Sequence, residues 1–239
     1  MGFLNRLLYI LTITTLVSCG PSRDNTAGPT VPYRGGDREQ VDVEATGTTV
    51  EYYASPDSPL PRVQAVLEQL GQFPAFTQVF SGVRVVVSRP GAQLTSLEGL
   101  DERFVGEGAA SCTELPPFPA GPVVFIRYNS IMAWDISFAH ELLHLKYCLL
   151  DQATRDRLQA VWEDMRNPAG PSSSYYGNAN EMFAYFGQWY LAGFATIVNE
   201  EVPAMHGILR DVLQEARLSG QFMTPEYVRH QVRDLKQKF

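Results

Sequence analysis

Residues 138–147 read FAHELLHLKY, and they place two of the chain's four histidines four positions apart. On a helix, residues i and i+4 lie on one face a turn apart, so His140 and His144 can direct imidazole nitrogens at the same ion. Glu141 points about 100° away, because a helix turns once in 3.6 residues. From there its carboxylate can reach a water on the ion without binding the ion itself. The spacing His-Glu-x-x-His therefore indicates a zinc site with an adjacent general base.

An ordinary buried helix with two hydrogen-bonded histidines is the alternative interpretation. The motif is interrupted and flanked by apolar residues, namely Phe138, Ala139, Leu142, Leu143 and Leu145. Burying two imidazoles and a carboxylate among such side chains without partners is costly in free energy. A bound metal ion would offset that cost, so the metal site is the favoured interpretation.

The third protein ligand of a catalytic zinc does not come from this helix. The extended motif H-E-x-x-H-x-x-G-x-x-H is excluded, because Tyr147 stands in place of its glycine and Leu150 in place of its last histidine. Cys148 continues the four-residue step, but His140 and Cys148 are about 12 Å apart along a helix axis, too far to bind one ion.

A carboxylate on a later helix is the better third ligand. Glu181 is the single carboxylate in the predicted apolar helix NANEMFAYFGQWYLAGF, residues 178–194. Glu163 and Asp164 are competitors on the intervening helix, residues 152–165. That helix is strongly charged and is expected to be solvated, so these two residues rank below Glu181.

The segments HELLH and NEMFA together resemble the gluzincins, zinc peptidases whose third ligand is a glutamate. Asn180 and Glu181 look like their Asn-Glu pair, and the separation of the two segments is most similar to the lethal-factor-like branch, which includes secreted proline-directed endopeptidases. The resemblance covers roughly residues 120–215. It implies one Zn²⁺ per chain held by His140, His144 and Glu181. It also implies peptide-bond hydrolysis by a zinc-activated water, with Glu141 as general base.

Two positions depart from the family pattern. The lethal-factor-like branch has a tyrosine seven residues before its glutamate ligand, where this chain has Ser174. Tyr175 and Tyr176 follow directly, and either could donate to the oxyanion, with Tyr176 preferred; the alternative is that both pack at the rim. Thermolysin-like enzymes have an aspartate four residues after the glutamate ligand, and Tyr185 stands there in this chain.

The order of predicted elements indicates an α+β domain, with strands early and helices late. Strands are expected at residues 48–54, 82–91 and 123–129, and helices at residues 58–73, 131–150, 152–165, 178–194, 202–220 and 224–239, with a loop-like stretch at 90–122. The resemblance refines this to a zincin-like fold: a small mixed sheet with an edge strand followed by the active-site helix, and a mostly helical C-terminal half. The strand from Val123 to Tyr128 would then be the edge that pairs with an extended peptide; an interior strand is the alternative.

The N-terminus predicts export. One arginine precedes an apolar run from Leu7 to Val17, which is too short to span a bilayer comfortably. The run ends in LVSCG, which resembles the bacterial lipobox and implies a lipid on Cys19 after removal of residues 1–18. A plain secretory signal with an incidental cysteine is the alternative. Residues 19–48 are expected to be a flexible tether and residues 49–239 the metallopeptidase-like domain.

The cysteine count and the net charge lead to further expectations about a disulfide and about binding partners. Cys112 and Cys148 are left after Cys19, and an exported chain favours a disulfide between them over two separate buried thiols. A net charge of −7 without a basic run argues against nucleic acid as a partner. A peptide or protein substrate and the membrane, through Cys19, are the expected partners, and no oligomeric state is predicted. The alternatives to a peptidase are a non-catalytic binding lipoprotein, a metal-free structural lipoprotein, or a hydrolase of a non-peptide amide.

Overall fold

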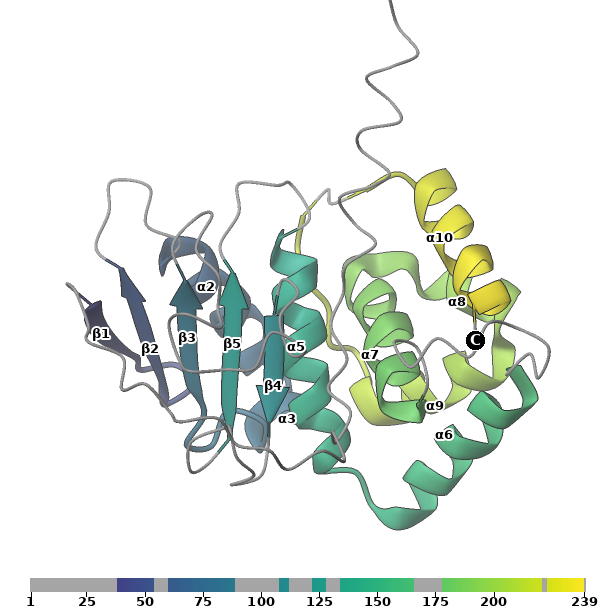
Figure 1. Cartoon of the computed structure of the whole chain (residues 1–239), viewed down its shortest axis with the longest axis horizontal. Coiled ribbons are helices and arrows are strands. Elements are labelled where there is room, and N and C mark those ends of the chain that lie inside the picture. Colours follow the sequence, from purple (N-terminus) through teal and green to yellow (C-terminus); the bar gives the residue numbers. More distant parts are fainter. Residues whose placement is uncertain are drawn as a thin grey trace, which may run out of the picture.

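The computed structural model describes residues 38–53, 60–88, 108–111, 122–127, 134–165, 178–220 and 223–238. These residues form the predicted α+β structure, with a mixed sheet in the first half of the chain and helices in the second (Figure 1). The sequence up to residue 37 lies outside this description. The signal segment and the lipid on Cys19 therefore stay predictions.

Five short strands form the sheet in the order β1-β2-β3-β5-β4. Strands β2, β3 and β5 run parallel, while β1 and β4 are antiparallel to their neighbours at the two ends. The bounds are β1 Arg38–Val43, β2 Thr48–Tyr53, β3 Arg84–Ser88, β4 Gly108–Ser111 and β5 Val123–Arg127.

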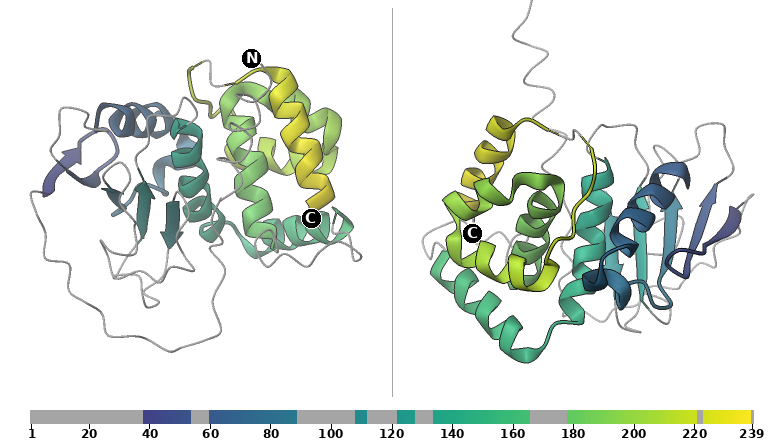
Figure 2. Two further views of the ribbon diagram at one scale, coloured as in Figure 1. Left: turned by 45° about the horizontal axis from the view of Figure 1, so that its top comes forward. Right: turned by 180° about the vertical axis from the view of Figure 1, so that it is seen from behind.

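The helices lie in two groups, on either side of α5. Helices α2, α3 and α5 lie along one face of the sheet, and the later helices pack on the far side of α5 (Figure 2). The bounds are α2 Leu60–Gly71, α3 Pro74–Thr77, α5 Trp134–Cys148, α6 Gln152–Met165, α7 Ala179–Trp189, the π-helical η2 Tyr190–Phe194, α8 Ala195–Glu201, α9 Pro203–Leu213 and α10 Pro225–Lys238. Among the described helices, none is both long enough and apolar enough to cross a membrane.

Apolar periodicity predicted the longer helices, although the helix expected over 202–220 ends at Leu213. The short helices α3 and α8 were not predicted. The expected inner face of α2 is buried as proposed, through Val63, Val66, Leu67 and Leu70. Helix α6 begins and ends where its amphipathic pattern does. The helix expected over 178–194 is α7 followed by η2, where Leu218 N donates to Leu191 O at 2.7 Å and Gly193 has φ 89°, a value that favours glycine.

The predicted tether reaches too far into the chain. Residues 38–43 form β1, which pairs with β2 through the turn at residues 44–47, so regular structure begins before Thr49. The stretch REQVDV escaped notice because its apolar residues are Val41 and Val43 alone and its other side chains are charged or polar. An end strand with one buried face needs no more than such an alternation.

The predicted edge strand was wrong. Strand β5 lies between β3 and β4 and is interior, so the position expected for Val123–Tyr128 belongs to β4. Among the described strands β4 pairs with β5 alone, and it lies beside α5 (Figure 1). The sequence GAAS gave no signal, because four small residues inside a loop-like stretch carry neither β-branched side chains nor a usable alternation.

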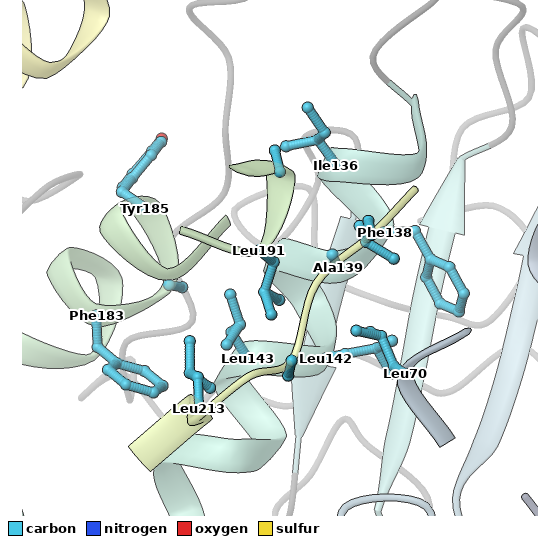
Figure 3. Close-up of a cluster of buried hydrophobic side chains, with 14 of the residues drawn as sticks. Leu70, Ile136, Phe138, Ala139, Leu142, Leu143, Phe183, Tyr185, Leu191 and Leu213 are labelled. Carbon is cyan, nitrogen blue, oxygen red and sulfur yellow. The ribbon is translucent and has the colours of Figure 1, made fainter. Parts of the chain in front are cut away.

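Helices α5 and α7 pack against each other over most of their length. Leu142 and Leu143 of α5 share one buried cluster with Phe183 and Leu191 (Figure 3). The helices approach closely at Gly187, where a Cβ would lie 2.9 Å and 3.2 Å from the two methyl carbons of Leu143. A residue without a side chain at this position therefore lets the two helices meet.

Replacing Gly187 by alanine should open this contact. We expect the free energy of unfolding to fall by about 1–3 kcal/mol, the usual effect of overpacking a buried site. Gly207 of α9 is the matched control, because a Cβ there meets nothing within 4 Å. Gly207→Ala should be neutral or stabilise by up to about 1 kcal/mol through helix propensity. Urea unfolding of both variants beside the wild type measures the difference.

A second substitution checks the cause. If the clash is with Leu143, Leu143→Val should cost less in the Gly187→Ala background than in the wild type. Equal stability of Gly187→Ala and wild type would contradict the close approach.

Candidate metal centre

The two predicted motif segments meet at the contact between α5 and α7. Helix α5 carries His140, Glu141 and His144, and the first turn of α7 carries Glu181. Their metal-binding atoms, taken from His140, His144 and Glu181, all lie within 4.8 Å of one another. The grouping of these three residues, predicted from sequence, is therefore present in the structure.

The spacing of the donor atoms suits one tetrahedral ion. His140 Nε2 and His144 Nε2 are 3.1 Å apart. Glu181 Oε2 is 3.6 Å from His140 Nε2, and Glu181 Oε1 is 3.7 Å from His144 Nε2. Ligands of a tetrahedral zinc with bonds of 2.0–2.2 Å lie about 3.3–3.5 Å from one another. Each carboxylate oxygen of Glu181 thus faces one imidazole nitrogen, and an ion between the three side chains would lie near donor atoms of all three.

Burial makes the case for a cation stronger. His140, Glu141, His144 and Glu181 are each at most 2% exposed. Two neighbouring carboxyl groups are costly to ionise together in an apolar interior. A divalent cation bound between the histidines and Glu181 would compensate that charge. The residues present therefore fit a metal ion, and their nitrogen and oxygen donors are those that zinc accepts.

Local structure at the start of α7 places the glutamate. Asn178 caps the helix, and its side-chain oxygen accepts a hydrogen bond from the backbone N–H of Glu181 at 2.9 Å. This cap fixes where the helix begins, because an N-cap side chain satisfies an N–H that has no partner within the helix. Asn180 and Glu181 consequently lie in the first turn, facing α5.

Asn180 orients one of the two histidines. Its Oδ1 lies 2.9 Å from His144 Nδ1. An amide oxygen only accepts, so Nδ1 carries the proton and Nε2 keeps its lone pair for a metal. This is how a ligating imidazole is usually held, with its second nitrogen donating to a fixed acceptor.

The environment shifts two pKa values in the site. Burial raises the pKa of Glu141 well above its usual range, and the negative charge of Glu181 raises it further. Burial also lowers the pKa of His144, and nearby His140 adds to this, while Glu181 and Asn180 act in the opposite direction. A lowered pKa keeps His144 in the neutral form that binds a metal.

The other predicted site residues either are not among the three ligands or lie outside the described part of the chain. Tyr175 and Tyr176, the expected oxyanion donors, lie outside the described residues, as do Cys19 and Cys112. Cys148 is disulfide-bonded and lies one turn beyond His144, which agrees with the prediction that it is not a ligand. The competing carboxylates Glu163 and Asp164 are exposed on α6.

Two residues of the site were missed from the sequence. The capping role of Asn178 has a signal, since an asparagine three residues before a glutamate often begins a helix. Tyr185 packs on His140 with ring centroids 4.7 Å apart, and its sequence position showed only that an aspartate was missing there.

Comparison of the chain with protein-family models, with characterised proteins and with solved structures gives no match. The argument for function therefore depends on the geometry of the metal centre and on the two motif segments. The resemblance to the gluzincins is carried forward as a proposal.

Removing the Asn180 contact should weaken metal binding. We expect Asn180→Leu to lower the affinity for zinc about 10–100-fold, because His144 loses the acceptor that fixes its proton and its ring. Asn180→Asp keeps an acceptor oxygen at the same place, so its affinity for zinc should stay close to that of the wild type and above that of Asn180→Leu. Competition with a chromogenic chelator measures the three affinities. Wild-type affinity in Asn180→Leu would show that the contact does not serve the metal.

Proposed function

We propose that this protein is a zinc metalloendopeptidase of the gluzincin type. The observation that carries the proposal is the convergence of His140, His144 and Glu181 from two helices, with the buried carboxyl group of Glu141 beside them. Three protein ligands leave a fourth tetrahedral position for water or substrate, as catalytic zinc sites require. A structural zinc site would instead be closed by four protein ligands.

Glu141 acts as the general base. When bound, a zinc ion supplies a Lewis acid and lowers the pKa of water to about 7. Glu141 accepts the proton of the attacking water at a carboxylate oxygen and passes it to the amine that leaves. Its raised pKa suits a group that must both take up and return a proton, and a cation at the neighbouring ligands counteracts part of the rise. Tyr176, or else Tyr175, is proposed to donate to the oxyanion.

The substrate is proposed to be an extended peptide. Strand β4 ends the sheet on the side of α5, so a peptide paired with it would lie along the helix that carries the site. Strand addition supplies main-chain hydrogen bonds irrespective of sequence, and pockets then select side chains. Strand β4, and not β5 as the sequence predicted, is therefore proposed to pair with the substrate.

The expected location is the bacterial cell envelope. The lipobox-like LVSCG supports a lipid on Cys19, which would hold the domain at a membrane surface facing the extracytoplasmic side. Peptide or protein substrates would then be those present in the envelope or just outside it.

Glu141→Gln tests the catalytic role. The variant should keep one zinc per chain, because Glu141 is not a ligand, while hydrolysis falls about 100–10,000-fold with the loss of the base. Zinc is measured by elemental analysis, and hydrolysis by mass spectrometry on a mixed peptide library that includes proline-containing sequences.

Two other outcomes would contradict different parts of the proposal. Equal cleavage by Glu141→Gln and wild type would remove Glu141 from the mechanism. A wild-type protein that holds zinc but cleaves no library peptide would favour the binding lipoprotein on the same fold.

A further inference from the structure

The two histidines of the site are held from α7 in different ways. His144 has a hydrogen-bonding partner in Asn180. Among the described residues, none provides a hydrogen-bonding partner for His140 Nδ1, although this atom is buried. What fixes the ring of His140 must therefore be sought in its packing.

The orientation of a histidine ring is not determined by its own side-chain torsions. The torsion about χ2 joins an sp³ carbon to an sp² ring and has broad, roughly two-fold preferences, so neighbours decide which way the nitrogens point. A half-turn of the His140 ring would replace Nε2 by a carbon and would remove one ligand from the triangle. The site needs one orientation out of two, and a hydrogen bond to Nδ1 is the usual means of choosing it.

Tyr185 is positioned to determine the orientation of the His140 ring. It lies one turn after Glu181 on the same face of α7, and it is 4% exposed. Its ring meets the ring of His140 with centroids 4.7 Å apart and planes inclined by 69°, an edge-to-face contact. Such contacts have a preferred geometry, because the positive edge of one ring faces the negative face of the other.

The residue type at this position also matters. Thermolysin-like enzymes have an aspartate here, four residues after the glutamate ligand, and a carboxylate can accept a hydrogen bond from a ligating histidine. A tyrosine ring cannot supply that charge. It can supply a ring of fixed orientation, and its charge distribution distinguishes a C–H or N–H edge of the imidazole from an edge that carries a nitrogen lone pair.

We propose that Tyr185 is a positioning residue for the metal centre: its ring, packed edge-to-face on His140, holds Nε2 toward His144 and Glu181. The inference rests on the proposed zinc site. It assigns to an aromatic ring the task that Asn180 performs for His144 through a hydrogen bond. Tyr185 contacts neither the metal position nor the substrate in this account, and acts through His140 alone.

The test compares zinc binding in four forms of the full chain. Tyr185→Phe keeps the ring, and its zinc affinity should stay within about threefold of the wild type. Tyr185→Leu removes the ring, and its affinity should fall about 10–100-fold, as for other losses of support around a ligand. Phe183→Leu is the control, because Phe183 is a fully buried aromatic residue of the same helix that contacts Tyr147 on α5. It should lose stability, measured by urea unfolding without metal, yet keep its zinc affinity.

A spectroscopic readout separates positioning from general stability. Cobalt(II) in the site reports ligand geometry through its visible absorption, which should change in Tyr185→Leu and stay unchanged in Tyr185→Phe and Phe183→Leu. Equal affinities and spectra for Tyr185→Leu and Phe183→Leu would overturn the positioning role. A loss in Tyr185→Phe as large as in Tyr185→Leu would overturn it too, because the hydroxyl group and not the ring would then be responsible. Failure of the wild type itself to bind zinc would overturn the proposed function together with this inference.

Discussion

The contact between α5 and α7 is the constraint on which the rest of the structure depends. It joins the sheet half of the chain to the helical half, and it brings a glutamate to within 3.7 Å of two histidines that precede it by 37 and 41 residues. The missing side chain of Gly187 permits the close approach, and the apolar side chains around it exclude water. The same exclusion of water that makes the polar groups costly would make a metal bound among them strongly held.

A metal ion bound at this contact would link metal binding to folding. Four ionisable or metal-binding side chains are buried at one point of the interior, and a cation could compensate them only when both helices are in place. A ligand that binds the folded chain and not the unfolded one stabilises the fold in proportion to the logarithm of its concentration. The centre would then act as a brace between the two halves as well as a reaction site, so loss of metal would loosen α7 against α5 first.

Local patterns determined how much could be predicted from the sequence. His140, Glu141 and His144 lie within one helical turn, so their spacing alone places them, and Glu181 is recognisable because it is a lone carboxylate in an apolar helix. Strand β4 has four small residues and no apolar alternation. The alternation in β1 is limited to Val41 and Val43, which is too short a pattern to identify a strand. The contact of Tyr185 with His140 is tertiary, and a tyrosine in an apolar helix carries no sign that it faces an imidazole.

An aromatic ring and a hydrogen-bond acceptor beside a ligating histidine differ in chemistry as well as in support. An oxygen that accepts a hydrogen bond from one imidazole nitrogen raises the basicity of the other nitrogen, and an aromatic ring does not. Asn180 therefore acts on the basicity of His144 as well as on its orientation, whereas the ring of Tyr185 could act on the orientation of His140 alone. In the proposed metal site the two histidines would thus be supported by different means: a hydrogen bond that also tunes one ligand, and a ring contact that only orients the other.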